Sequence, residues 1–231
     1  QDGADPYPRK AAMMAEVYKA ACIAFGQPVQ TFDFAYRDKD GNYHEERGLT
    51  PQAFYQKYVG LSLRDYVAVI NEPTADKPLD TPIQFHAVEN MAGCDMKALN
   101  LSQEALEELC VKQLKNGQAI WFACDAGAFG ARKEGIWDPA SVQYEALLGG
   151  FSTAMPKGKR LEYNSSSATH AMLLTGVHFD KEGKPDRWKI ENSWGKDVGD
   201  KGYFVCSEDY FQEFVYEAVI DRRHFSPAQL A

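Results

Sequence analysis

Two apolar stretches near the C-terminus, separated by a turn sequence, constrain the fold of this chain most strongly. Ala171 to Val177 is an almost continuous apolar run, and Arg187 to Glu191 alternates between charged and apolar residues, as strands do. Residues 180–184 between them read Asp-Lys-Glu-Gly-Lys, which is typical of a tight turn. We therefore expect an antiparallel hairpin in which the start of the first strand lies beside the end of the second.

His170 opens the first stretch and Asn192 follows the second, so the hairpin predicts that they face each other. A thiol protease needs an imidazole that takes the thiol proton and a third group that holds this imidazole in one tautomer. A side-chain amide does so without adding a full negative charge, which leaves a thiolate–imidazolium pair at rest. We predict His170 as general base and then acid and Asn192 as its orienting residue, with Trp194 covering their hydrogen bond. The alternative is a structural histidine beside a strand and a simple Asn-Ser turn.

The sequence around both residues resembles the His and Asn blocks of papain-like cysteine peptidases, and its details are similar to the bleomycin hydrolase / aminopeptidase C branch. The segments that carry the resemblance are Thr50–Tyr55, Ile120–Asp125, Thr169–Met172, Glu191–Gly195, Gly202–Val205 and Ser207–Phe211. The resemblance covers most of the chain from about Phe32 onward. It implies an α+β, papain-like fold whose antiparallel, β-rich half carries His170 and Asn192, together with helical segments. We expect residues 118–231 to form that half and residues 1–117 to form a mixed part with family-specific insertions.

The nucleophile of this family lies upstream, in a Gln…Cys-Trp block, and no Cys-Trp pair occurs here. Gln118 and Cys124 have the six-residue offset that the family uses between its oxyanion-hole glutamine and its nucleophile. Two features oppose this pair: the negative charge of Asp125 disfavours a neighbouring thiolate, and no helix begins after Cys124. We therefore expect the nucleophile in an N-terminal half that precedes this chain.

The resemblance implies a cysteine-type aminopeptidase that removes N-terminal residues from peptides. It further implies a homohexamer in which the C-terminal tail enters the cleft and its carboxylate binds the substrate amine, a role that would fall to Ala231. Two alternatives remain open. One is a non-catalytic papain-like module for assembly or peptide binding, and the other is an acyl-transfer enzyme on the same scaffold.

Composition limits the partners of the chain. A net charge of −8 over 231 residues argues against nucleic acid, which requires a basic surface. The five cysteines are scattered without a Cys-x-x-Cys pair, so we expect no zinc site and a reducing, cytoplasmic environment, with export left open as an alternative. Asp38, Asp40 and Asn42 lack the glycine and glutamate that a calcium loop needs at the required offsets. We predict no metal or other cofactor, and no apolar run is long enough to cross a membrane.

Overall fold

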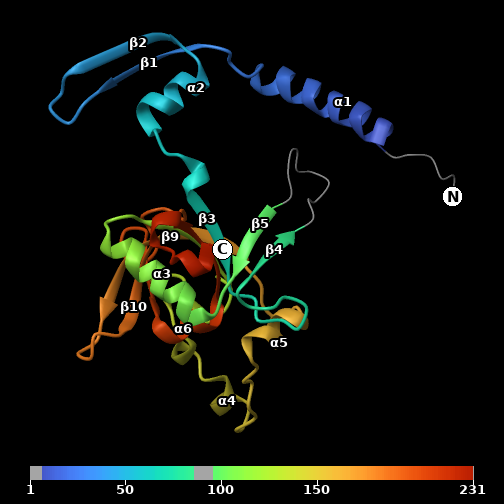
Figure 1. Cartoon of the computed structure of the whole chain (residues 1–231), viewed down its shortest axis with the longest axis vertical. Coiled ribbons are helices and arrows are strands. Elements are labelled where there is room, and N and C mark those ends of the chain that lie inside the picture. The colour runs from blue at the N-terminus through green and yellow to red at the C-terminus, as the bar shows by residue number, and fades with distance from the viewer. Residues whose placement is uncertain (1–6, 86–95, 231) are drawn as a thin grey trace. The chain divides into compact units, whose positions relative to one another are not determined.

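The structure, a computed structural model, describes residues 7–85 and 96–230 (Figure 1). Its internal contacts divide the chain into two compact units, Gln1–Ser62 and Leu63–Ala231. The sequence predicts another boundary, between residues 117 and 118. That boundary separates two functional parts of a peptidase and is not based on compactness, so it stays a prediction.

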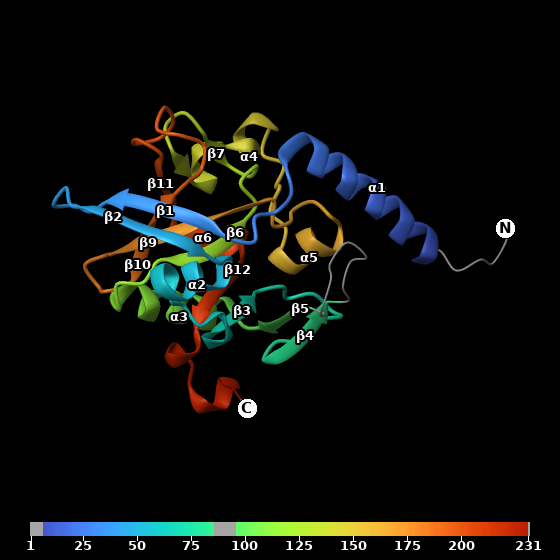
Figure 2. The ribbon, with the colours of Figure 1, turned by 90° about the horizontal axis from the view of Figure 1, so that it is seen from above.

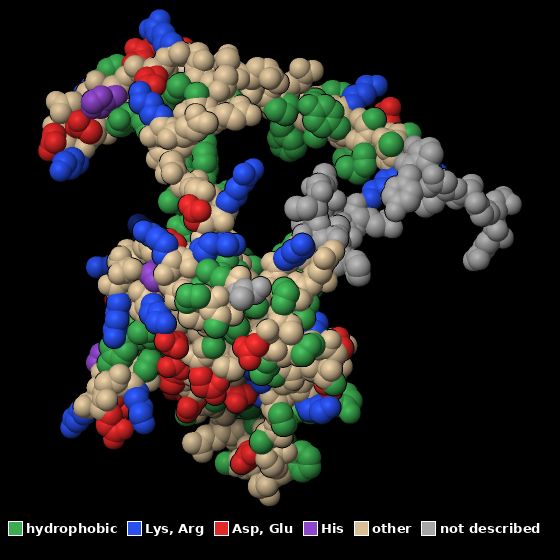
Figure 3. All heavy atoms as spheres, viewed as in Figure 1, with side chains coloured by type: hydrophobic (Ala, Val, Ile, Leu, Met, Phe, Trp, Pro, Cys, Tyr) green, Lys and Arg blue, Asp and Glu red, His purple; other side chains and the backbone are tan. Residues whose placement is uncertain are grey.

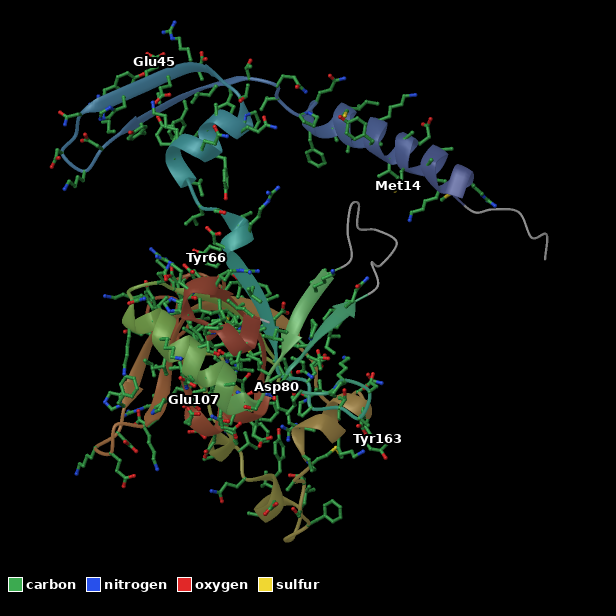
Figure 4. All side chains as sticks on the ribbon, in the orientation of Figure 1. Met14, Glu45, Tyr66, Asp80, Glu107 and Tyr163 are labelled. Carbon is green, nitrogen blue, oxygen red and sulfur yellow. The ribbon has the colours of Figure 1, made fainter. Side chains whose placement is uncertain are left out.

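The N-terminal unit consists of a helix, a hairpin and a second helical stretch. These elements are α1 (Tyr7–Phe25), β1 (Phe32–Arg37), β2 (Tyr43–Leu49), α2 (Pro51–Phe54) and the π-helix η1 (Tyr55–Val59). β1 and β2 pair antiparallel, and the ring of Phe34 lies 4.9 Å from that of Phe54, so the hairpin is held to α2 by aromatic packing. Figures 3 and 4 show hydrophobic side chains, Met14 among them, at the surface of α1.

The turn between β1 and β2 is held together by the carboxylate of Asp38. One of its oxygens accepts hydrogen bonds of 2.9 Å from the backbone N–H groups of Asp40 and Asn42. The other accepts from the side chains of Asn42 and His44, at 3.1 and 3.0 Å. These bonds, chiefly the one from His44, hold the pKa of Asp38 well below its usual range. The carboxylate of Asp38 therefore serves the local geometry of the turn.

The C-terminal unit is built on one ten-stranded sheet with the strand order β4-β5-β3-β12-β6-β9-β10-β11-β8-β7. Its strands are β3 (Tyr66–Ile70), β4 (Thr81–Phe85), β5 (Met96–Asn100), β6 (Ile120–Cys124), β7 (Gly130–Ala131), β8 (Ile136–Trp137), β9 (His170–Phe179), β10 (Pro185–Glu191), β11 (Tyr203–Ser207) and β12 (Val215–Asp221). Most neighbours pair antiparallel, whereas β3–β5 and β8–β11 are parallel. The expected β9–β10 hairpin is present in this sheet.

Among residues 63–85 and 96–230, four α-helices accompany the sheet, namely α3 (Gln103–Lys115), α4 (Tyr144–Leu147), α5 (Lys157–Glu162) and α6 (Glu208–Phe214). Short 3-10 turns occur at Leu63–Asp65, Pro139–Ser141, Arg222–His224 and Pro227–Leu230. Ser102 and Ser207 cap α3 and α6, each accepting a backbone hydrogen bond of 3.2 Å three residues on. α3 packs on β12, β9 and β6, and α6 packs on β10, β11 and β12. Seen from above, α3 and the β9–β10 hairpin lie on one side of this unit, and β4 and β5 lie on the other (Figure 2).

The core of this unit lies between the sheet and these two helices. Alternate residues of β9 and β10, among them Leu174, Trp188 and Ile190, are fully buried. Trp188 stacks on Phe211 of α6, with ring centroids 4.1 Å apart. This burial fixes the register of the hairpin, because a slip by one residue would turn these side chains outward. The positions of the residues at the open end of the hairpin are fixed with it.

Candidate active site

His170 and Asn192 meet at the open end of the β9–β10 hairpin. β10 ends at Glu191, opposite Leu173, so Asn192 follows β10 close to the start of β9 at His170. The side chains are joined by a hydrogen bond of 3.0 Å between Nε2 of His170 and Oδ1 of Asn192. The structure thus brings together the two residues that the sequence predicts as neighbours, and both are half-buried.

The hydrogen bonds of Asn192 define the tautomer of His170. Oδ1 of Asn192 also accepts a hydrogen bond of 2.7 Å from the backbone N–H of Ser193, which identifies this atom as the oxygen of the amide. An oxygen accepts, so Nε2 of His170 must donate. The proton of the neutral imidazole therefore resides on Nε2, and Nδ1 carries the free lone pair. An imidazole in this state can take a proton through Nδ1.

Trp194 covers the same pair. Its ring is nearly parallel to the imidazole of His170, at an interplanar angle of 14° and a centroid distance of 5.0 Å. Trp194 is held in turn by Trp137 and Phe204, whose rings lie 5.9 and 5.7 Å away and are buried. This stack shields one face of the imidazole from water and limits its rotation.

The loop after Asn192 is tied back to the hairpin. The backbone N–H of Asn192 donates to the carbonyl of Gly202 at 3.1 Å, and Gly202 has a φ of +90°. A Cβ at Gly202 would lie 3.2 Å from the carbonyl oxygen of Gly195 and would require a strained backbone. Glycine at this position therefore lets the loop close behind Asn192 and Trp194.

Cys124 lies directly opposite His170 in the sheet, on β6, but it does not have the properties of a nucleophile. Its side chain is completely buried, and burial raises its thiol pKa to about 12. Thiolate is the reactive form, so Cys124 is inert near neutral pH. The other described cysteines are free; Cys110 and Cys206 are fully buried, and Cys22 lies on α1 of the N-terminal unit. Cys94 lies outside the described residues.

Gln118 is not part of the candidate site. It precedes β6, whereas Cys124 ends that strand, so the two residues are separated by the length of β6. The side chain of Gln118 instead contacts Asp221, at 3.4 Å, and His224, at 3.2 Å. These contacts lie at the start of β6, whereas Cys124 and His170 lie at its end. The six-residue offset therefore does not produce the proximity that an oxyanion hole requires.

Ala231, predicted to bind the substrate amine, lies outside the described residues. Its neighbour Leu230 borders a cavity of about 520 Å³ together with Val67 and Leu99, on the β3–β5 side of the sheet. Within residues 7–85 and 96–230, no three His, Cys, Asp or Glu side chains are grouped so as to hold a metal ion. In the same residues no helix combines the length and apolarity that crossing a bilayer demands.

Comparisons with known proteins establish the family to which the chain belongs. A model of the Peptidase C1-like family matches residues 4–231, which is nearly the whole chain. The chain belongs to this family. It is 42% identical over 224 residues to Aminopeptidase C of Streptococcus thermophilus, covering 96% of this chain and 50% of that protein. It is 38% identical over 218 residues to Aminopeptidase C of Listeria monocytogenes, covering 94% and 49%.

A solved structure of this group supports the fold. The crystal structure of PepW from Lactobacillus rhamnosis superimposes with a TM-score of 0.91 and 42% identity, covering 99% of this chain and 52% of that one. The predicted α+β, papain-like fold and the resemblance to aminopeptidase C are thereby confirmed. The chain spans about half the length of the curated relatives it matches.

Proposed function

We propose that this chain supplies the base and orienting residues of a cysteine-type aminopeptidase whose nucleophile lies outside these 231 residues. The observation that carries the proposal is the hydrogen bond from Nε2 of His170 to Oδ1 of Asn192, which leaves Nδ1 as a proton acceptor. The relatives named Aminopeptidase C support peptides as substrates and removal of N-terminal residues as the reaction.

In this mechanism Nδ1 of His170 takes the proton of the nucleophilic thiol, and the thiolate adds to the carbonyl carbon of the scissile peptide bond. The imidazolium then gives its proton to the departing amine as the C–N bond breaks, leaving a thioester. Next His170 takes a proton from water, whose oxygen attacks the thioester, and the thiol is regenerated. Asn192 keeps one tautomer in place throughout, and Trp194 keeps bulk water from the imidazole face.

Two further observations support a site that is completed by another part of the protein. Cys124, which lies opposite His170 on the neighbouring strand, is buried and inert. Nδ2 of Asn192 is also buried, and it has no hydrogen-bond partner among the described residues. A buried amide donor without a partner costs about 1–3 kcal/mol, so an acceptor from the remaining half would relieve this cost.

The predicted homohexamer, with the carboxylate of Ala231 at the substrate amine, remains part of the proposal, as does a cytoplasmic location. The free thiols of Cys110, Cys124 and Cys206 agree with a reducing compartment. A non-catalytic module is the second candidate, and the inert Cys124 favours it if the preceding half lacks a reactive cysteine.

The test uses the full-length protein with and without His170→Ala, assayed on aminoacyl fluorogenic substrates. We expect thiol-dependent hydrolysis in the wild type and a loss of at least about a hundredfold in kcat for the variant, since general base catalysis contributes that much. Thermal melting should be unchanged. Hydrolysis retained by the variant would refute the role of His170, and absence of hydrolysis by the wild type would favour the module.

A further inference from the structure

A short turn next to the candidate site carries an arginine that the predicted triad does not use. Arg132 follows β7 and lies in the turn that leads to β8. The turn is fixed to the loop behind Asn192, because the backbone N–H of Gly199 donates to the carbonyl of Lys133 at 3.1 Å. Gly135 approaches the same loop so closely that a Cβ on it would lie 2.6 Å from Cα of Gly199. The backbone that bears Arg132 is therefore held in place beside the site.

The side chain of Arg132 lies over the indole that covers the predicted base. Its guanidinium carbon is 4.5 Å from the ring centroid of Trp194, and that ring is 5.0 Å from the imidazole of His170. The guanidinium therefore lies within about 9.5 Å of the imidazole centre, the sum of these two distances. Stacking on an aromatic ring positions a guanidinium while leaving its N–H groups free to donate.

Arg132 is solvent-exposed, and it takes part in none of the ion pairs found within the described part of the chain. By contrast, Arg160, Arg187 and Arg223 each pair with an aspartate or glutamate. A planar guanidinium with free donors binds a carboxylate through two parallel hydrogen bonds. Arg132 is thus an oriented anion-binding group close to His170.

The reaction brings a carboxylate to this place when the substrate is a dipeptide. The departing amine must come within about 3 Å of the imidazole nitrogen to receive its proton. In a released amino acid, the carboxylate carbon lies about 2.5 Å beyond this amine, two covalent bonds away. This puts a carboxylate about 6–7 Å from the imidazole centre, and the guanidinium lies no more than about 9.5 Å from the same centre.

On the basis of the proposed function, we propose that Arg132 binds a carboxylate on the residue released by cleavage. The carboxylate is either the free C-terminus of a dipeptide or the side chain of an acidic residue directly after the scissile bond. Arg132 is thereby a specificity-determining residue that favours short or acidic leaving groups over neutral ones.

The experiment compares kcat/KM of the full-length protein for Leu-Ala, Leu-Ala-amide, Leu-Asp-amide and Leu-Asn-amide. We expect the wild type to favour Leu-Ala over its amide and Arg132→Met to lower this ratio about fivefold to tenfold, as befits a partly exposed charge-assisted pair. The ratio of kcat/KM for Leu-Asp-amide to that for Leu-Asn-amide shows whether Arg132 also binds an acidic side chain. Arg132→Lys should keep part of the preference. The control, Lys133→Met, removes the adjacent positive charge and should leave both ratios unchanged.

The outcomes separate this proposal from the one on which it rests. If Arg132→Met slows all four substrates equally, the residue only supports Trp194, and the binding role is refuted. An unchanged rate for every substrate refutes it as well. Absence of thiol-dependent hydrolysis in the wild type refutes the proposed peptidase function, and the role of Arg132 with it.

Discussion

Lys157 allows a specific test of how the segment before His170 is held in place. It begins α5, the helix that leads into the segment before His170, and only 9% of its surface is exposed. Its Nζ donates to Oε1 of Gln103 at 2.9 Å and to the carbonyls of Gln212 and Val215 at 3.1 and 2.6 Å. These bonds join α5 to α3 and to the junction of α6 and β12. Replacing Lys157 by methionine removes the charge and the three bonds but keeps most of the side-chain volume.

Burial lowers the pKa of Lys157 from 10.5 to about 7. The unfolded chain therefore binds more protons than the folded chain between pH 7 and pH 10.5, and the free energy of unfolding rises with pH across that window. Integrated from pH 7 to pH 9, this gain is about 2 kcal/mol for the wild type. Lys157→Met has no ammonium group to titrate, so its unfolding free energy should not show this gain. The variant should also lose about 2–3 kcal/mol overall, because three buried acceptors are left without a donor.

The assay is urea-induced unfolding at pH 7 and pH 9, followed by tryptophan fluorescence. The stability difference between wild type and Lys157→Met should widen by about 2 kcal/mol at the higher pH. The control is Lys159→Met, which changes an exposed lysine paired with Glu162 on the same helix, and its difference from wild type should be nearly the same at both values. A Lys157→Met difference that does not change with pH would refute the burial of this ammonium group.

Two further predictions follow from the buried groups around the sheet. Burial and the nearby Glu208 raise the pKa of Glu107 to about 7, so the stability that it contributes is present below its unfolded pKa and is lost as pH rises through the folded value. Glu107→Gln removes this titration. After allowance for solvent screening, the change in unfolding free energy that it causes should be about 1 kcal/mol more stabilising at pH 8 than at pH 5. Equal changes at both pH values would contradict this reasoning. Cys124→Ala should retain full peptidase activity at a cost of about 1 kcal/mol in unfolding free energy. A variant that folds but is inactive would instead identify Cys124 as the nucleophile.

The hairpin and its two polar residues could be predicted because local signals agree there. Alternating burial, a turn sequence and apolar strands all specify one register, and that register alone places His170 next to Asn192. The start of α3 is a local feature of the same kind, since the side chain of Ser102 caps it. Signals that agree within a few residues need no knowledge of distant parts of the chain.

Features that depend on distant contacts could not be predicted from the sequence. The offset between Gln118 and Cys124 matched a functional pattern, but the extended strand β6, which rises about 3.3 Å per residue, lies between them. β5 and α5 have no strong local signal, because both are short and are stabilised by distant segments, β5 by pairing with β3 and α5 through Lys157. A lysine between Pro156 and Gly158 carries no local sign of burial. Arg132 acquires its position from the packing of its turn against the loop at Gly199 and from its stacking on Trp194.

The most direct test of the central claim is to identify the reactive thiol. Full-length protein is treated briefly with iodoacetamide at pH 6, and the labelled cysteine is located by peptide mass spectrometry. We predict rapid labelling of one cysteine outside these 231 residues, slowed at least about a hundredfold by His170→Ala, because the imidazolium maintains the thiolate. Labelling of Cys124, or a rate that does not depend on His170, would contradict a site divided between this chain and the rest of the protein.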